Sequence, residues 1–337
     1  MKEILNHLIE YKTLDKQTAR GVLTELANGK YNESQMAAFL TVFMMRNITV
    51  EELEGFRDAM LDLCLKIDLS GYDAMDLCGT GGDGKDTFNI STLSSFVVAG
   101  AGQNVAKHGN NGVSSICGSS NLLASFGYEF SNDESKLKSD LDRSGICFLH
   151  APLFHPAMKN IAPIRRDLGV KTFFNMLGPM VNPSFPDKQI VGVFNLELAR
   201  LYGYLYQQTT KKFSIVHALD GYDEISLTGA FKSISNQGEE ILEPADLGLN
   251  VYLESELAGG STIEESAKIF YSILDGKGTA AQKDAVCANA GFALFTSGNA
   301  NSPEEGVGLA KESLASGKAM KAFKDLLDKP VVLNMNM

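Results

Sequence analysis

Apolar residues in the first 66 positions recur at the spacing of an α-helix. Residues 13–30, 32–47 and 49–67 each show this period; Gly29 is a stop signal for the first helix, and Asn32 or Ser34 could cap the second. The apolar stripe over 32–47 suits a small helical core, and it would also suit an interface. We therefore expect an all-helical domain over residues 1–66.

After residue 72 the pattern changes to short apolar runs that alternate with helical segments. The runs at 74–79, 104–109, 145–151, 189–194 and 213–221 predict strands, and the segments between several of them predict helices. This alternation is typical of strand–helix–strand units and a mostly parallel sheet. Past residue 230 we expect short strands, glycine-rich turns and two late helices, at 262–278 and 281–298.

Residues 155–183 interrupt the alternation with two helical pieces that end at Gly-Pro and Asn-Pro. We interpret this insert as a return of the chain to the helical domain. The predicted division is a helical domain of residues 1–66, rejoined by an insert at about 152–182, and an α/β domain of residues 72–150 and 185–337. The fold class is thus a small all-helical domain plus a large α/β domain with a central, mostly parallel sheet flanked by helices.

Composition and net charge restrict the range of possible functions. The 337 residues include 30 Lys and Arg against 41 Asp and Glu, a formal net charge of −11. This balance argues against a nucleic-acid surface, which needs clustered basic side chains to neutralise phosphates. A small phosphate ligand is still compatible with it if backbone N–H groups or a metal ion supply the positive field.

Cysteine usage and hydropathy indicate a cytoplasmic protein. The five cysteines are an odd number without paired or metal-ligand spacing, so we expect reduced thiols. The N-terminal residues form an amphipathic helix pattern rather than a signal peptide. No apolar run reaches the roughly 18 residues needed to span a membrane, and we expect no membrane association.

The stretch GTGGDGKDTFNIST, residues 79–92, has the glycines and lysine of a phosphate-binding P-loop but not its end. That motif needs Ser or Thr after the lysine, and here Asp86 follows Lys85. Glycines after a strand allow positive φ and a concave row of N–H groups that binds anions. Ser91 or Thr92 could cap a following helix, whose N-terminus also attracts anions. A plain glycine turn is the alternative interpretation.

Two further stretches favour an anion-binding loop over a plain glycine turn. KHGNNGVSS, residues 107–115, is a second candidate anion loop after a second predicted strand. Because ligands gather at the carboxyl ends of parallel strands, the two loops could share one crevice. Asp223 and Glu224 follow another strand, and such adjacent carboxylates suit Mg²⁺. A solvated acidic turn is the alternative for this pair.

These stretches, together with the insert and DGYDE at 220–224, occur in an order that resembles the anthranilate phosphoribosyltransferases, a family of nucleoside phosphorylase-like phosphoribosyltransferases. The resemblance extends to about residue 300, although the first two stretches are shared with pyrimidine nucleoside phosphorylases. It implies transfer of the 5-phosphoribosyl group from phosphoribosyl pyrophosphate to the amine of anthranilate, with release of pyrophosphate, in tryptophan biosynthesis. It also implies a homodimer that forms through the helical domain.

The resemblance implies roles for individual residues. The expected phosphoribosyl pyrophosphate site comprises Gly79, Gly82, Asp83, Thr87, Asn89, Ile90, Ser91, Thr92, Lys107, His108, Gly109, Asn110, Asn111, Gly112, Val113, Ser114, Ser115 and Ser119. The expected anthranilate site comprises Gly79, Asn110, Arg165 and Gly178. Mg²⁺, with two ions expected, would be held by Ser91, Asp223 and Glu224. His108 could contact the substrate amine, although a packed loop histidine is equally compatible with the sequence.

The sequence departs from the family pattern in the second loop. Asn111 stands where the family usually has Arg, and Ile116-Cys117 stands where Lys-Ser is common. Both changes remove positive charge from the pyrophosphate loop. Two other functions remain open, a pyrimidine nucleoside phosphorylase and a non-catalytic relative that binds nucleic acid. The insert favours the anthranilate family over the former, and the negative charge argues against the latter.

Overall fold

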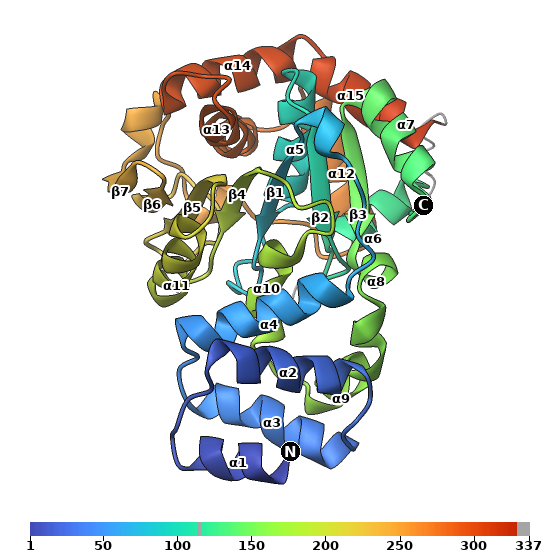
Figure 1. Cartoon of the computed structure of the whole chain (residues 1–337). Coiled ribbons are helices and arrows are strands. Elements are labelled where there is room, and N and C mark those ends of the chain that lie inside the picture. Colours follow the sequence, from blue (N-terminus) through green and yellow to red (C-terminus); the bar gives the residue numbers. More distant parts are fainter. Residues whose placement is uncertain (113–115, 329–337) are drawn as a thin grey trace. The chain divides into compact units, whose positions relative to one another are not determined.

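The computed structural model describes residues 1–112 and 116–328, and their contacts divide the chain into two units (Figure 1). The helical unit consists of residues 1–67 and 151–185, and the α/β unit consists of residues 68–150 and 186 onward. The α/β unit contains a mostly parallel sheet flanked by helices. The predicted fold class is therefore confirmed.

The helical unit is built from segments that begin at clear capping signals. Asn32 caps α3 in a capping box with Gln35, and Thr49 caps α4 in the same way. The elements of this unit are α1 (Lys2–Ile9), α2 (Lys16–Ala27), α3 (Glu33–Met45), α4 (Val50–Leu63), α8 (Ala151–Phe154), η2 (Pro156–Asn160), α9 (Ala162–Leu168), α10 (Phe174–Leu177) and η3 (Gly178–Val181).

An aromatic cluster attaches the insert to the N-terminal helices. Phe173 stacks on Phe56 of α4 with ring centroids 4.4 Å apart, and it meets Phe39 and Phe43 of α3 edge-on. All four side chains are buried. The stripe over 32–47 thus serves the core of this unit, although Met44 at its end is 44% exposed.

Glu52 is a fully buried carboxylate that joins three parts of the helical unit. It forms an ion pair with Arg46, accepts a hydrogen bond from the Leu14 amide at 2.9 Å and closes the capping box at Thr49. Burial alone would raise the pKa of Glu52, but the hydrogen bonds from Arg46, Leu14 and Thr49 outweigh burial and leave its pKa below the ordinary value.

The α/β unit is organised around one sheet. Within the described residues it has seven strands in the order β3-β2-β1-β4-β5-β6-β7, of which β6 and β7 are antiparallel to their neighbours. The strands are β1 (Met75–Gly79), β2 (Val105–Gly109), β3 (Ile146–His150), β4 (Lys188–Gly192), β5 (Lys212–Ala218), β6 (Phe231–Ser235) and β7 (Gly238–Leu242).

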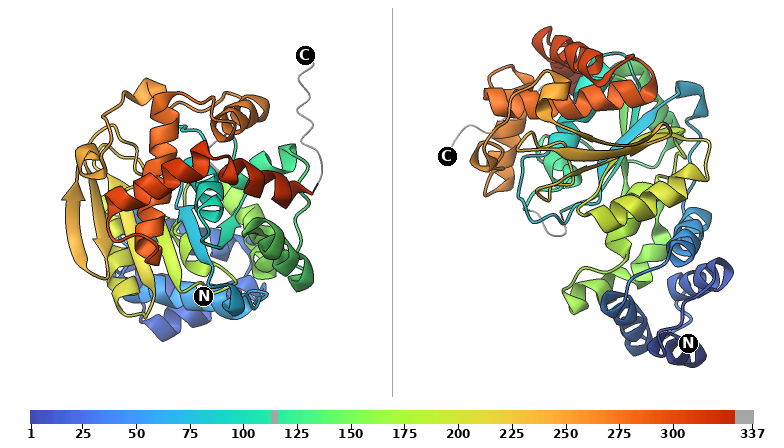
Figure 2. Two further views of the ribbon diagram at one scale, coloured as in Figure 1. Left: turned by 90° about the horizontal axis from the view of Figure 1, so that it is seen from above. Right: turned by 90° about the vertical axis from the view of Figure 1, so that its left-hand side faces the viewer.

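Helices cover both faces of this sheet. In the right-hand view of Figure 2, α13 and α14 lie on one side of the sheet and α11 lies on the other. The helices of this unit are α5 (Ile90–Gly100), α6 (Ser119–Ser125), α7 (Glu134–Ser144), α11 (Leu196–Gln207), α12 (Ile263–Leu274), α13 (Ala280–Ser297), α14 (Pro303–Ala315) and α15 (Lys318–Leu327), with short turns η1 (Ser70–Tyr72), η4 (Pro244–Leu247) and η5 (Glu254–Glu256).

The prediction of only two late helices was wrong, because α14 and α15 follow them. Glycines at positions 306 and 308 obscured the pattern of α14, since glycine normally disfavours a helix interior. Here the glycine serves packing: a Cβ on Gly306 would lie 2.1 Å from the carbonyl oxygen of Gly291 in α13. The two helices therefore touch backbone to backbone, and α13 is held in a fixed position.

Two further sequence expectations concern compartment and membrane. All five cysteines are unpaired. Among the helices of residues 1–112 and 116–328, none combines the length and the apolar character required to cross a bilayer.

We predict that Glu52→Gln destabilises the helical unit by about 3–5 kcal/mol, because it leaves the buried Arg46 guanidinium without its charge partner. Urea denaturation followed by circular dichroism measures this loss. The lowered pKa of Glu52 means that the carboxylate contributes stability above its ordinary pKa and loses that contribution as pH falls through the folded-state pKa. The difference between the two proteins should therefore shrink at acidic pH.

Glu10→Gln is the matched control, because Glu10 forms an exposed ion pair with Lys12 in the same unit. It should leave the unfolding midpoint unchanged. Equal effects of the two substitutions would contradict the assignment of Glu52 as the central buried anchor.

Candidate functional site

The sheet places its site at the border between β1 and β4. These strands pair in parallel with Gly79 opposite Gly192, the last residue of each. From β1 the chain proceeds through β2 to β3 on one side, and from β4 it proceeds to β5 on the other. The strand order therefore reverses here, and in open α/β sheets ligands bind at the carboxyl ends of the strands at such a point.

The loop after β1 is a chain of glycine turns, not a P-loop. Gly81, Gly82 and Gly84 all have positive φ, which glycine adopts without steric cost. Lys85 does not begin a helix; its ammonium lies 4.5 Å from the Tyr222 ring and 3.3 Å from the Glu254 carboxylate. The loop leads into α5, and its N–H groups are the candidate anion donors.

The helix after this loop begins earlier than the sequence suggested. Asn89 is the N-cap of α5 and makes no side-chain cap hydrogen bond, so the prediction that Ser91 or Thr92 caps the helix was wrong. Both residues lie in the first turn, where the backbone N–H groups still lack partners within the helix. The side chains of Ile90 and Thr92 are buried, so a ligand at this end would meet backbone rather than these side chains.

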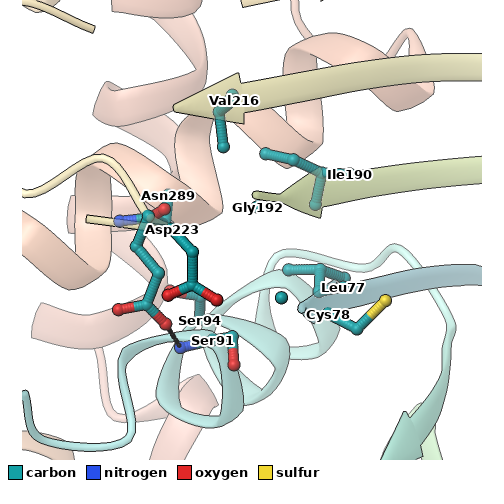
Figure 3. A pocket seen from close by; sticks show the side chains of 11 residues that line it. Leu77, Cys78, Ser91, Ser94, Ile190, Gly192, Val216, Asp223 and Asn289 are labelled. Atoms are coloured by element: carbon teal, nitrogen blue, oxygen red, sulfur yellow. Dashed lines mark hydrogen bonds between the residues drawn. The ribbon is translucent and has the colours of Figure 1, made fainter. Parts of the chain in front are cut away.

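Asp223 and Glu224, the acidic pair after β5, accept hydrogen bonds from backbone amides of the glycine loop and of the first turn of α5. The Gly81 amide donates to Asp223 Oδ2 at 2.6 Å, and the Ser91 amide donates to Glu224 Oε1 at 3.1 Å. The Asp223 amide in turn donates to Asp83 Oδ2 at 3.4 Å. Figure 3 shows the hydrogen bond at Ser91, at the start of α5. The fold thus brings together residues more than 130 positions apart in sequence.

Two glycines make this approach possible. A Cβ on Gly79 would lie 2.6 Å from Asp223 Oδ2, and a Cβ on Gly192 would lie 1.5 Å from the Asp223 carbonyl oxygen. Any side chain at Gly192 would displace the acidic turn. Sequence reasoning assigned Gly79 to ligand contact and overlooked Gly192, although both end a strand.

Burial makes the acidic pair electrostatically costly. Asp223 is buried, and burial together with the nearby charge of Asp83 raises its pKa to about 7. Burial and the neighbouring Asp223 raise the pKa of Glu224 well above its ordinary value. Lys107 is the buried cation nearby; its ammonium donates to the Leu77 carbonyl and lies 3.4 Å from Ser91 Oγ, and burial lowers its pKa. A cation at the pair would relieve the repulsion.

The donor atoms suit a hard cation such as Mg²⁺, which commonly uses one or two carboxylates plus substrate phosphates and waters. No cluster of three or more His, Cys, Asp or Glu side chains able to hold a metal occurs in the described parts of the chain. Beneath the pair lies a cavity of about 20 Å³, enough for about one water, which is lined by both carboxylates and by Leu77, Ile190 and Val216.

One hydrogen bond joins the segment of the second loop to the first loop, and several local hydrogen bonds fix the shape of the second loop. Asn89 Nδ2 donates to the Cys117 carbonyl at 2.8 Å, which joins the two loops. The Asn110 carbonyl accepts from the Ser120 amide at 3.1 Å, and Asn121 Oδ1 accepts from the amides of Gly112 and Gly118. Asn121 is a further residue that sequence reasoning missed.

The other predicted residues of this loop lie nearby or cannot be placed. Ser119 begins α6, and its hydroxyl lies 3.3 Å from the Asn110 carbonyl. His108 is buried in β2, and its amide donates to Asp76 Oδ1 at 3.2 Å. In the first loop, the predicted residue Thr87 forms a β-bridge with Ala258. Val113, Ser114 and Ser115 lie outside the described residues.

Two predicted anthranilate residues belong to the helical unit. Arg165 of α9 is half-buried, lies over the Phe174 ring at 5.1 Å and donates to Asn175 Oδ1 at 3.3 Å. Burial lowers the pKa of its guanidinium, and no carboxylate among the described residues forms an ion pair with it. Arg166 beside it is exposed, as is Gly178 at the start of η3.

Comparison with known proteins covers nearly the whole chain. Residues 71–320 match the α/β domain of a glycosyl transferase family, and residues 2–64 match its helical bundle domain. The anthranilate phosphoribosyltransferase of Flavobacterium psychrophilum is 63% identical over 326 residues, which cover 97% of this chain and 98% of that protein.

Solved structures of anthranilate phosphoribosyltransferases are similar to this chain along nearly its whole length. The anthranilate phosphoribosyltransferase of Thermus thermophilus is similar with a TM-score of 0.89 and 33% identity over 96% of this chain and 98% of that one. The Saccharomyces cerevisiae enzyme in complex with PRPP and Mg gives a TM-score of 0.88 and 27% identity, with 96% of each chain covered. The chain belongs to the anthranilate phosphoribosyltransferase family.

Proposed function

We propose that this chain transfers the 5-phosphoribosyl group of phosphoribosyl pyrophosphate to the amine of anthranilate, giving N-(5-phosphoribosyl)anthranilate and pyrophosphate in tryptophan biosynthesis. The observation that carries the proposal is the acidic pair, buried Asp223 and half-buried Glu224, held against a glycine loop and a helix start at the strand-order reversal. The high identity to family members over nearly the full length favours this reaction over phosphorolysis of pyrimidine nucleosides.

The proposed site for phosphoribosyl pyrophosphate spans both loops. The backbone of the glycine loop from Gly79 to Asp83 and the first turn of α5 would bind phosphate oxygens. Lys107 and the loop from Gly109 to Gly112 would continue the site toward Ser119. These donors would stabilise the leaving group, on which negative charge develops as the bond from C1 to pyrophosphate breaks.

We propose Mg²⁺ at the acidic pair, because the yeast relative is described in complex with PRPP and Mg and because this pair provides hard oxygen donors with repelling charges. Two ions are our expectation: Asp223 faces Gly81 and Asp83, whereas Glu224 faces the start of α5 at Ser91. When bound, Mg²⁺ would neutralise charge on the pyrophosphate. Ser91, Asp223 and Glu224 would hold it, and the protein's N–H donors would orient the phosphates.

Positioning governs the second half of the reaction. The neutral aromatic amine attacks C1 as pyrophosphate leaves, a C–N bond replaces the C–O bond, and the amine releases one proton to water. The half-buried Arg165 suits the anthranilate carboxylate, because a charged hydrogen bond to a carboxylate is strong and directional. Asn110, Gly79 and Gly178 complete the proposed anthranilate contacts. We assign no proton transfer to His108, which is buried in β2.

The proposal also covers the oligomeric state and the cellular location of the protein. We propose a homodimer through the helical unit, where Ile9, Tyr11, Met44 and Met45 are exposed apolar side chains; sedimentation velocity reports whether it forms. The unpaired cysteines support a cytoplasmic location. We propose neither nucleic acid nor a membrane as a partner.

We predict that the double variant Asp223→Asn, Glu224→Gln loses turnover by orders of magnitude while keeping its fold, because it removes the charges that would hold Mg²⁺. An assay of anthranilate fluorescence in the presence of phosphoribosyl pyrophosphate and Mg²⁺ measures turnover, and circular dichroism checks the fold. Wild-type protein in excess chelator should behave like the variant. Full activity under either condition would contradict the assignment of Mg²⁺ to this pair.

We predict that Arg165→Ala raises the KM for anthranilate about ten- to a hundred-fold, since a lost charged hydrogen bond is worth roughly 1.5–3 kcal/mol. The KM for phosphoribosyl pyrophosphate should change little. Arg166→Ala is the matched control on the same helix, and its exposed side chain should be dispensable. An equal rise in both KM values for Arg165→Ala would point to a structural role instead.

We predict that Gly192→Ala lowers kcat/KM on the order of a hundredfold, because its methyl group must displace the Asp223 carbonyl and a misplacement of about 1 Å has effects of this size. Gly229→Ala is the control in the same unit, since a Cβ there meets no atom within 4 Å. Steady-state kinetics of both variants separates the cases. An active Gly192→Ala enzyme would show that the close approach is not required.

A further inference from the structure

A buried amide on α13 holds the residue that follows the acidic pair. Asn289 Oδ1 accepts a hydrogen bond from the Ile225 amide at 3.0 Å, and Asn289 Nδ2 donates to the Ile225 carbonyl at 2.9 Å. Nδ2 also donates to the Ala285 carbonyl at 2.9 Å. One side chain therefore binds both backbone groups of Ile225, as a neighbouring strand would.

This arrangement admits one orientation of the amide. If its oxygen and nitrogen were exchanged, the Ile225 amide would face a donor and both carbonyls would lose theirs. Asn289 is only 6% exposed, and the stretch around it, residues 285–294, is buried throughout. A buried amide without partners is destabilising, so these bonds account for a polar residue in an otherwise apolar stretch.

The helix that carries Asn289 is packed closely against two neighbouring helices. Gly291 and Gly306 bring α13 and α14 into backbone contact, and Ser94 of α5 donates to the Val286 carbonyl at 3.2 Å. Asn289 therefore projects from a fixed element. A group that must be held within a fraction of an ångström is best supported by such an element.

Asn289 and the acidic pair line the same small cavity, and Figure 3 shows Asn289 beside Asp223 there. The two carboxylates are otherwise held at their tips, by the amides of Gly81 and Ser91. If Asp223 and Glu224 turn from these amides toward a cation, those tip contacts are lost. The bond to Asn289 lies in the backbone and persists, so it can hold the turn in both arrangements.

We propose that Asn289 is a positioning residue for Asp223 and Glu224, which clamps the backbone at Ile225 and so fixes where both carboxylates present their oxygens to Mg²⁺. The proposal rests on the metal role given to the pair under the proposed function. Groups that orient metal ligands in this way typically contribute about 10–100-fold to metal affinity.

The test is calorimetric titration of phosphoribosyl pyrophosphate in excess Mg²⁺, which reports binding without turnover. For Asn289→Ala we expect affinity about 10–100-fold below that of the wild type, with the KM for anthranilate within about twofold. Amide hydrogen exchange over residues 219–228 should become faster. Asn289→Gln keeps an amide but moves it by one methylene, so it should fold and show the same loss.

Thr296→Val is the matched control. Thr296 lies on the same helix, and its hydroxyl is within 2.7 Å of Ser214 in β5, away from the acidic turn. Removing this hydroxyl should lower the stability of the same helix while leaving the affinity unchanged.

The outcomes separate the two proposals. If the wild type and the double variant Asp223→Asn, Glu224→Gln bind equally well, the metal role fails. If that variant loses binding but a folded Asn289→Ala or Asn289→Gln protein binds within about twofold of the wild type, the positioning role fails. Failure of both Asn289 variants to fold also overturns it, in favour of a purely structural residue.

Discussion

The site depends on the close approach of an acidic turn to the glycine ends of two neighbouring strands. Asp223 can lie over β1 and β4 only because neither strand ends in a side chain, and its carboxylate then reaches the amide of Gly81. Placing the buried Asp223 and the half-buried Glu224 beside Asp83 is unfavourable, and the raised pKa values of the pair express that cost. A site that stores such repulsion is prepared for a cation.

The rest of the α/β unit keeps this arrangement in place. The strand-order reversal between β1 and β4 brings loops from distant parts of the sequence to one edge. Helices α13 and α14 meet backbone to backbone at Gly291 and Gly306, which provides a fixed support behind the turn. In the helical unit, Glu52 and the cluster around Phe173 perform the corresponding task, joining distant segments through buried contacts.

Much of this could be predicted from sequence because its signals are local. The alternation of apolar runs gave the sheet, the cap at Asn32 gave a helix start, and the two loops and the acidic pair stood out by composition. What sequence could not supply is contact between distant residues. The need for glycine at position 192 arises from a turn 31 residues further along, and the hydrogen bonds of Asn289 join it to a residue 64 positions earlier. Gly306 of α14 is an unfavourable residue for a helix interior by sequence alone, and only its close packing against Gly291 of α13 explains it.

A crystal structure of the protein with phosphoribosyl pyrophosphate and Mg²⁺ tests the central claim most directly. The account predicts oxygens of Asp223 and Glu224 in the coordination shell of Mg²⁺ at about 2.0–2.1 Å, with pyrophosphate and water as the other ligands. A structure in which water and pyrophosphate alone surround Mg²⁺, while both carboxylates still accept hydrogen bonds from Gly81 and Ser91, would contradict it.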